Sequence, residues 1–357
     1  TQGNYNVALG KGTLESDTLG SRSTAIGTNA LQVQNFTTAT NSDNTAVGAF
    51  TGDAITTGID NTLIGAFAGS ALTDADHNVA IGRAALASDT LGSKSVAIGR
   101  EALVTQNFTT ATDAYNVAVG YSAGLSVTTG VRNTLIGGLA GDSLTNGDDN
   151  IALGYNALST EDTGSKSIAI GFEALKTQNN AASNHNVAVG HAAGTAVTTG
   201  VQNVLIGGLA GDALTDADYN VALGYGALST DTLGSTSIAI GTNALATQNF
   251  TTATNAYNVA VGDSAGVAIT TGVNNTLIGG LAGDALTDAD GNTALGLLAL
   301  SSDTLGSRST AIGRSALQTQ NFTTATNAYN VAVGFDAGTA VTTGIRNTLM
   351  GSEAGDA

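Results

Sequence analysis

The chain has 357 residues, 48 of them Gly, with no Cys or Trp and a formal net charge of −17. Its 11 Lys and Arg are scattered, which disfavours a nucleic acid or an anionic membrane surface as partner, because phosphates are bound by clusters of basic side chains. The apolar content of 42% is too high for a disordered chain, and no apolar run approaches the ~18 residues of a membrane-spanning helix.

A five-residue motif recurs along the whole chain. Asn or Ser is followed by Val, Thr or Ile, then Ala or Leu, then a large apolar residue, then Gly. The motif begins at residues 6, 23, 44, 61, 78, 95, 116, 133, 150, 167, 186, 203, 220, 237, 258, 275, 292, 309, 330 and 347. The spacings of 17, 21, 17 and 17 residues form a super-repeat of 72 residues, and only the third copy is two residues shorter.

The super-repeats cover 6–77, 78–149, 150–219, 220–291 and 292–357, without a linker between them. They predict one continuous repeat domain over residues 1–357. Because the chain begins inside a repeat, we expect it to be part of a longer protein.

The spacing identifies the fold class. A period of 17 residues is too short for a helical-hairpin repeat, which needs about 33. Each motif is rich in β-branched or small residues and ends with Gly, as strands often do. We therefore predict an all-β parallel β-solenoid, or β-roll, of about 20 coils with one strand per coil. Strands stacked at ~4.8 Å would make a rod of roughly 95 Å.

The columns of the motif predict its faces. We number each coil from the first residue of its motif, so that position 1 is Asn or Ser and predicts a ladder of stacked side chains. Positions 2 and 4 share one face of the strand, which we assign to the interior, and position 3 faces the other way. Position 3 is always Ala or Leu, which predicts that a second copy of the chain covers it. The predicted oligomer interface comprises Ala80, Ala97, Ala118, Leu63, Leu135, Leu205 and Leu277.

In the second half of each coil, one large side chain is kept, but its position differs between coils. The first two coils of a super-repeat carry Leu at position 9, as in Leu86 and Leu103. The other two carry Gly there and a large residue at position 12, as in Val127 and Leu144. This exchange predicts a packed interior of constant volume.

The motif, as in "NVAIG" at 78–82 and "SVAIG" at 95–99, resembles the head repeats of trimeric autotransporter adhesins, which also occur in bacteriophage tail fibres and bacterial surface fibres. The resemblance covers Asn6 to Gly351. It implies a left-handed parallel β-roll, three chains around one axis with position 3 facing that axis, and an extracellular role in adhesion. The coils here are longer than is usual in that family, and its neck motif, coiled coil and barrel anchor have no counterpart in this sequence.

One group of loops has the oxygen spacing of a calcium site. Hard oxygen ligands at i, i+2 and i+4 open a calcium-binding loop. That pattern occurs at Asp74, Asp76 and Asn78, at Asp216, Asp218 and Asn220, and at Asp288, Asp290 and Asn292. The alternative, which we prefer because a distal bidentate Glu is missing, is an Asx-rich turn that satisfies its own backbone.

The 21-residue coils hold most of the aromatic residues. Phe36, Phe108, Phe250 and Phe322 lie in their loops, and Tyr115, Tyr257 and Tyr329 precede the next motif. Exposed rings beside Asn and Thr could stack on a sugar, which makes these seven residues candidate ligand contacts. Alternatively, and in our preferred interpretation, Phe plugs the loop against the roll or a neighbouring chain.

The sequence predicts no enzyme. The three His, at 77, 185 and 191, form no triad or metal motif, and no catalytic signature is present. We expect a homotrimeric structural and adhesive fibre at a bacterial surface or on a virion, binding a host surface or glycan, without a cofactor. The alternative is a passive spacer with the binding tip elsewhere. A remote alternative is a calcium-binding solenoid, or an ice-binding one because Thr recurs at position 13.

Overall fold

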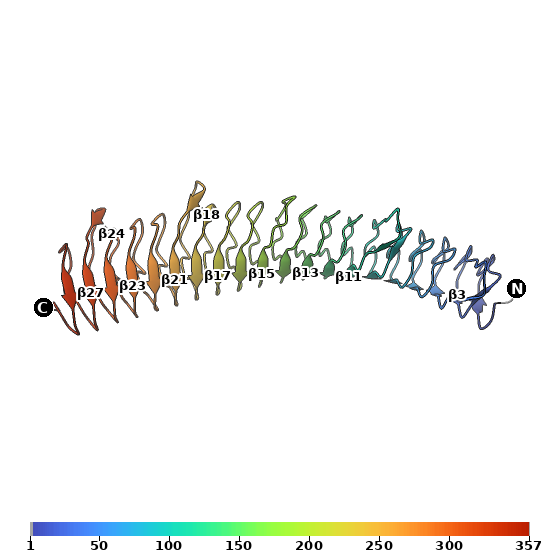
Figure 1. The fold of residues 1–357 in the computed structure, drawn as a ribbon, viewed down its shortest axis with the longest axis horizontal. Coiled ribbons are helices and arrows are strands. Elements are labelled where there is room, and N and C mark those ends of the chain that lie inside the picture. The colour runs from blue at the N-terminus through green and yellow to red at the C-terminus, as the bar shows by residue number, and fades with distance from the viewer. Residues whose placement is uncertain (1–2, 357) are drawn as a thin grey trace. The chain divides into compact units, whose positions relative to one another are not determined.

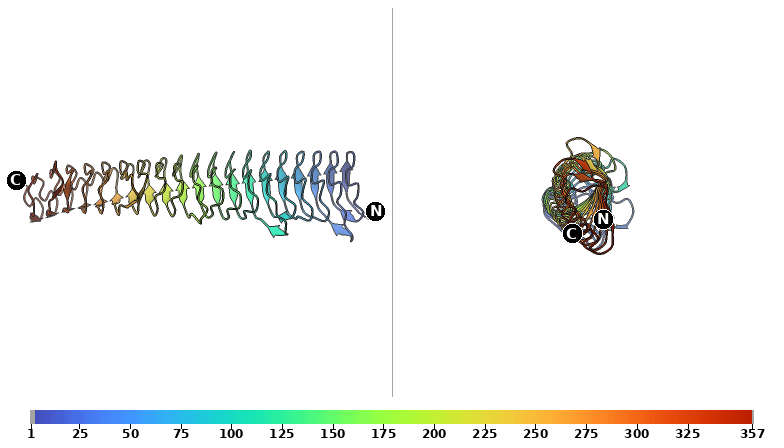
Figure 2. Two further views of the ribbon diagram at one scale, coloured as in Figure 1. Left: turned by 90° about the horizontal axis from the view of Figure 1, so that it is seen from above. Right: turned by 90° about the vertical axis from the view of Figure 1, so that its left-hand side faces the viewer.

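The structure is a computed structural model that describes residues 3–356. It confirms the predicted all-β parallel solenoid of about twenty coils. The described residues contain no helix, and so none that is long and apolar enough to cross a membrane. They form two compact units: unit 1 comprises 3–173 and 179–184, and unit 2 comprises 174–178 and 185–356. Within each unit, successive coils lie side by side (Figures 1 and 2).

Unit 1 contributes one three-residue strand per motif to a parallel sheet. These strands are β1 (Val7–Leu9), β3 (Thr24–Ile26), β5 (Thr45–Val47), β6 (Thr62–Ile64), β7 (Val79–Ile81), β9 (Val96–Ile98), β11 (Val117–Val119), β12 (Thr134–Ile136), β13 (Ile151–Leu153) and β14 (Ile168–Ile170). Two further pairs of short parallel strands are β2 (Gly20–Ser21) with β4 (Thr40–Asn41), and β8 (Gly92–Ser93) with β10 (Thr112–Asp113).

Unit 2 is built in the same way. Its motif strands are β15 (Val187–Val189), β16 (Val204–Ile206), β17 (Val221–Leu223), β19 (Ile238–Ile240), β21 (Val259–Val261), β22 (Thr276–Ile278), β23 (Thr293–Leu295), β25 (Thr310–Ile312), β27 (Val331–Val333) and β28 (Thr348–Met350). Its short pairs are β18 (Gly234–Ser235) with β20 (Thr254–Asn255), and β24 (Gly306–Ser307) with β26 (Thr326–Asn327).

The register aligns each motif with the next. Ala80 of β7 pairs with Ala97 of β9, and Ile81 pairs with Ile98. At position 1 the Asn residues form the predicted ladder, mainly through main-chain groups at the start of the next coil and near the end of their own coil. The side-chain oxygen of Asn78 accepts from the N–H of Ser95 at 2.9 Å, and its amide donates to the carbonyl of Gly92 at 2.9 Å.

The two faces of the motif strand are the reverse of the prediction. Position 3 points into the roll, whereas Ile64 and Leu153 at position 4 are 39% and 41% exposed. The predicted interface is therefore wrong, because its residues are fully buried within one chain: Ala80, Ala97, Ala118, Leu63, Leu135, Leu205 and Leu277. Both columns are apolar, so polarity could not distinguish them. Side-chain size distinguishes them in most coils, because the interior position 3 is Ala in fifteen of the twenty motifs, whereas position 4 is large in all of them.

The large side chains at positions 9 and 12 fill the interior as predicted, and position 3 joins them. Leu86, Leu103, Val127 and Leu144 are all fully buried. Leu at position 3 occurs only in the coils that begin at 61, 133, 203, 275 and 347, where Gly stands at position 9 of the same and the preceding coil. A Cβ built on Gly124 would lie 2.8 Å from Leu135 Cδ1, so the Leu fills the space that this Gly leaves.

Each coil turns through residues with positive φ. At position 5 only Gly fits: Gly82 has φ +132, and an added Cβ would lie 2.4 Å from the carbonyl oxygen of Gly99. The residue immediately before each motif is also left-handed, with φ 60 at Tyr219, 63 at Thr236 and 51 at Tyr257. We call this column of residues, one per coil, the corner ladder.

Candidate functional site

Three surface or loop features stand out from the regular coils. The first is the strand face, which we define as the side chains at positions 2 and 4 of every motif. Position 2 is always Val, Ile or Thr, and position 4 is always Val, Ile, Leu or Met, so the face carries no charge in any motif. Its larger side chains are partly open to solvent in one chain, as at Ile206 (39%), Ile278 (36%) and Leu295 (43%).

The second feature is a set of four lobes, formed by residues 36–43, 108–115, 250–257 and 322–329. Each lobe pairs its short strand with the end of the preceding coil, as β10 pairs with β8, and the lobes stand out from the coils (Figure 2). The third super-repeat, whose loop is two residues shorter, has only a single bridge between Ser165 and Ser183 at this place.

The aromatic residues of the lobes divide into two groups. The four Phe side chains are only 5–6% exposed, so the hypothesis that they contact a ligand is wrong. They instead plug the lobes: a Cβ on Gly92 would lie 2.7 Å from Phe108 Cδ2, which means that the ring packs on the glycine backbone. Tyr115, Tyr257 and Tyr329 are 52%, 57% and 44% exposed and remain accessible to a ligand.

The third feature, which was not predicted from the sequence, is a buried polar network beneath three of the four lobes. Asp89 has no exposed area, and one of its oxygens accepts the N–H groups of Gly92 and Phe108 at 3.0 and 3.1 Å. Its other oxygen accepts from Gln106 Nε2 at 2.6 Å. Gln106 in turn accepts from Asn116 Nδ2 at 2.9 Å, which connects the lobe to the Asn ladder.

The same network recurs at Asp231 and Gln248 and at Asp303 and Gln320. A signal for it was present in the sequence, because position 12 is Asp, Glu or Gln in the same coils that carry Leu at position 9. Every donor of the network is satisfied inside the roll, so these carboxylates hold the lobe in place and leave no open group for chemistry.

The residues of the calcium hypothesis accept hydrogen bonds from neighbouring coils. Asp74 Oδ1 accepts from the Thr57 hydroxyl at 2.6 Å, and Asp76 Oδ1 accepts from the Ile59 N–H at 2.8 Å. Asn78 is buried with its amide used in the Asn ladder. The equivalent oxygens of Asp216, Asp218 and Asn220, and of Asp288, Asp290 and Asn292, are used in the same way. Within residues 3–356 no three His, Asp or Glu side chains gather to hold a metal. The hydrogen bonds at these residues have the pattern of an Asx-rich turn, and calcium binding stays a prediction.

The Thr residues at position 13 use their hydroxyls along the roll. Thr73 Oγ1 donates to the carbonyl of Thr90 at 3.0 Å, and Thr128 Oγ1 donates to that of Thr145 at 3.2 Å. These hydroxyls serve the contact between coils, which reduces what they could offer to ice.

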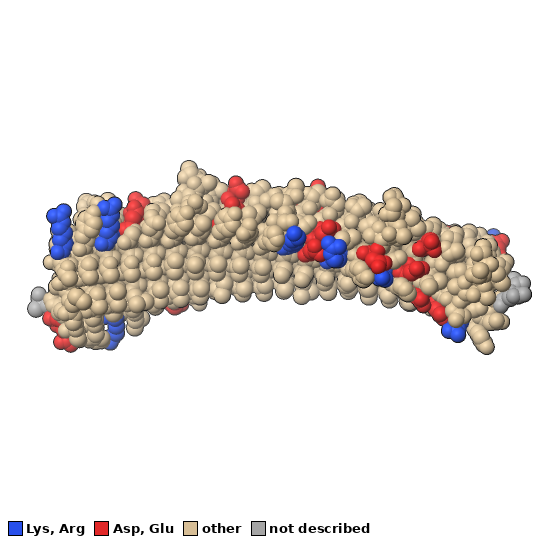
Figure 3. Space-filling view, in the orientation of Figure 1, with Lys and Arg blue, Asp and Glu red and all other residues tan. Residues whose placement is uncertain are grey.

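The charged groups of the surface pair with their neighbours where neighbours exist. Hydrogen bonding to Lys94 Nζ, 2.6 Å away, lowers the pKa of Asp113. Arg132 likewise lowers the pKa of Asp149 through a 2.6 Å contact. In the view of Figure 3, Lys and Arg lie over the coils of unit 1 and near β24, and none lies over the coils of β15 to β22.

Four half-buried carboxyls have no such partner. One oxygen each of Asp53, Asp142, Asp212 and Asp284 lacks a hydrogen bond. Burial raises the pKa of all four above its usual range. They lie at position 10 of separate coils, so they form no cluster.

Comparison with known proteins adds no family to these observations. No family model matches the sequence, and a comparison with curated proteins finds no match either.

Proposed function

We propose that this chain is a segment of an extracellular structural fibre, in which identical chains associate through the strand face and the lobes contact a host surface or glycan. The number of chains that we propose, three, comes from the resemblance to trimeric autotransporter adhesin heads, as does the location on a bacterial surface or a virion. In this proposal the protein is not an enzyme and needs no cofactor.

The observation that carries the proposal is the uncharged strand face. Ten strands of one unit at ~4.8 Å spacing give an uncharged strip roughly 43 Å long, with an apolar side chain at position 4 of every motif. Soluble monomers seldom leave such a continuous strip open to water, and apolar patches of this kind usually mark a protein interface. A second copy of the chain offers the matching strip with the same spacing, so each rung can meet an identical rung.

The oligomer is tested by charging the strand face. Ile206→Asp together with Ile278→Asp places carboxylates at two partly exposed positions. The unaltered protein should sediment as a trimer and the variant as a monomer with an unchanged β-sheet circular dichroism spectrum. Thr252→Asp, at an exposed lobe position outside the strand face, is the matched control and should stay trimeric. A folded monomer of the unaltered protein in dilute buffer would overturn the proposal.

The second candidate function is a passive spacer, and it is favoured by the burial of the four Phe side chains, which leaves few lobe groups for binding. Changing Tyr115, Tyr257 and Tyr329 together to Ser separates the two functions. If the lobes bind, adhesion to cells or glycans should fall while the melting temperature stays the same, because these rings are half exposed. Unchanged adhesion of a strongly adhering parent would favour the spacer.

A further inference from the structure

The corner ladder contains one site that differs from its sister sites in the other super-repeats. In the second super-repeat, Lys94 lies over the ring of Tyr115, with Nζ 5.2 Å from the ring centroid and 3.2 Å from the phenol oxygen. In the fifth, Arg308 lies over Tyr329, with Cζ 5.6 Å from the ring centroid, and its Nη1 donates to the phenol oxygen at 2.6 Å. In both places the chain supplies its own cation to the tyrosine face.

The fourth super-repeat lacks this cation. Thr236 stands where the other two have Lys94 and Arg308, with nearly the same φ of 63 against 63 and 64. Its hydroxyl turns back to donate to the carbonyl of Ser235 at 2.5 Å, so it does not cover a ring. The next residue of the ladder, Tyr257, is 57% exposed.

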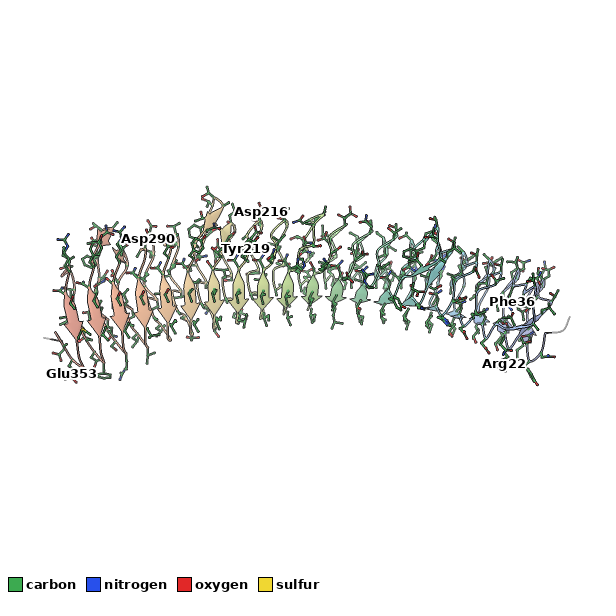
Figure 4. The ribbon with its side chains drawn as sticks, viewed as in Figure 1. Arg22, Phe36, Asp216, Tyr219, Asp290 and Glu353 are labelled. Carbon is green, nitrogen blue, oxygen red and sulfur yellow. The ribbon has the colours of Figure 1, made fainter. Side chains whose placement is uncertain are left out.

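A second tyrosine borders the same rung from the other side. Tyr219 precedes Thr236 in the ladder and is 53% exposed. In the fifth super-repeat, Gly291 stands in the place of Tyr219. An added Cβ on Gly291 would lie 3.8 Å from Arg308 Cγ, so a side chain at this position lies next to the residue that supplies the cation. Tyr219 and Tyr257 are two rungs apart, or roughly 10 Å at ~4.8 Å per rung. Tyr219 lies on the side of the roll that also carries β18 and Asp216 (Figure 4).

The charge around this rung favours a cation from outside. Between Lys176 and Arg308 the sequence contains nine Asp and no Lys, Arg or Glu. Two of these carboxylates, Asp216 and Asp218, lie just before Tyr219, and the N–H of Thr236 bonds the carbonyl of Asp218 at 3.0 Å. Such a region repels anions and concentrates cations, and tyrosine faces attract cations further.

We propose that Tyr219, Thr236 and Tyr257 form a binding site for an organic cation, a guanidinium or ammonium group that the chain itself does not supply. The bound cation would lie over the side chain of Thr236, between the rings of Tyr219 and Tyr257. It would take the place that the side chains of Lys94 and Arg308 occupy beside their own tyrosines. It could belong to a partner protein's side chain or to a free small amine. The site is complete within one chain, so it does not depend on the association through the strand face.

The experiment measures the protection of tyrosines from nitration, residue by residue, by mass spectrometry on the full chain. Arginine amide is the probe, and citrulline amide, which has the same shape without the charge, is its neutral control. Arginine amide should saturably slow the nitration of Tyr219 and Tyr257, and citrulline amide should not. Tyr155 and Tyr225, which are exposed outside the corner ladder, are internal controls that should react at unchanged rates.

Two variants use the sister sites as controls. Thr236→Arg supplies the missing cation and should weaken arginine amide binding at least roughly fivefold. Arg308→Thr with Gly291→Tyr rebuilds the site in the fifth super-repeat and should make Tyr329 protectable. Gly291 already has φ 66, close to the value of Tyr219, so the backbone accepts the change.

The remaining probes separate the sources and the competing class of ligand. A tetra-arginine peptide that binds much more tightly than arginine amide would indicate a protein partner, and equal affinity per guanidinium would indicate a free amine; both outcomes support the site. Equal protection by citrulline amide, protection by methyl glucoside instead of arginine amide, or unaltered binding by Thr236→Arg would each overturn it.

Discussion

The lobe of the fourth super-repeat and the shortened loop of the third solve the same packing problem with different residues. In the lobe, Asp231 accepts from the N–H groups of Gly234 and Phe250 at 3.0 and 3.1 Å, and the Phe250 ring fills the space above them. In the shortened loop, Phe is replaced by Asn180 and the buried acid is Glu161. Glu161 accepts from Gly164 N–H at 2.7 Å and from Asn184 Nδ2 at 3.0 Å.

The difference shows which parts of the lobe depend on each other. The longer acid and the Asn184 amide reach into space that the Phe ring occupies elsewhere, since a Cβ on Gly164 would meet Asn184 and Glu161 rather than an aromatic ring. The buried carboxylate that receives a glycine N–H is kept in both loops. The length of the acid and the bulk of the loop change together, which indicates that they are energetically coupled.

Removing the acid from a lobe should have the largest effect. Asp231→Ala leaves the Gly234 and Phe250 N–H groups without their acceptor inside the roll, and it removes one of the two acceptors of Gln248 Nε2, the other being Ser237 Oγ. We expect a loss of about 3–5 kcal/mol in the free energy of unfolding of that region, because each orphaned donor costs about 1–3 kcal/mol. Hydrogen exchange should accelerate strongly at these amides, while those of Gly306 and Phe322 in the sister lobe remain protected. Slow exchange at all four would contradict the role assigned to Asp231.

Removing the ring should cost less than removing the acid. Phe250→Ala leaves a cavity over Gly234 but keeps the polar network, so we expect a loss of about 2–4 kcal/mol, a little below the range for fully enclosed rings. Denaturant unfolding followed by circular dichroism measures this change. Phe335→Ala, whose ring is 44% exposed, is the matched control and should cost well under half as much. Similar losses for both residues would show that Phe250 does not act as a plug.

Exchanging acid and loop together should restore most of the stability. Asp231→Glu alone forces an extra methylene against Phe250 and should cost about 1–3 kcal/mol. Replacing residues 250–257 by the sequence of 180–185 in that background should bring the unfolding free energy back to within about 1 kcal/mol of the parent, as expected for coupled sites. The loop exchange without Asp231→Glu is the second single change that the double-mutant cycle requires. If the effects of the two changes simply add, the coupling is absent.

The regular part of the fold could be predicted from the sequence because each rung repeats the same information. Twenty motifs predicted twenty strands in register, and the exchange of Leu between positions 9 and 12 predicted a filled interior. The faces of the strand could not be assigned by polarity, because Ala80 and its neighbours Val79 and Ile81 are all apolar. Side-chain size distinguishes the two faces in most coils, but it does so only when the width of the coil interior is known.

The lobe was predicted in part. Its Phe was expected to plug the loop, and the structure buries it. The acid beneath it was missed, because an Asp in a soluble protein is exposed unless something pairs with it, and the partners of Asp89 come from backbone N–H groups that lie 3 and 19 residues away. The corner ladder was missed for a similar reason, since residues as different as Tyr219, Thr236 and Arg132 share one left-handed conformation.

The carboxyl groups at position 10, unlike the buried acids of the lobes, each have one buried oxygen without a hydrogen bond. Changing one of them should have the smallest effect on stability. Asp212 is half-buried with one unpartnered oxygen, and burial raises its pKa. A carboxyl whose pKa is higher in the folded than in the unfolded state adds stability at low pH, and that stability is lost as the pH rises from the usual carboxyl range through the raised value.

Asp212→Asn should therefore raise the unfolding free energy at neutral pH, by at most about 1 kcal/mol, and have no such benefit below the usual carboxyl range. Urea unfolding at several pH values measures this, with Asp216→Asn, an exposed residue whose carboxyl already has a hydroxyl partner, as the control. A stability gain that is equal at all pH values would mean that the ionisation of Asp212 is not its cause.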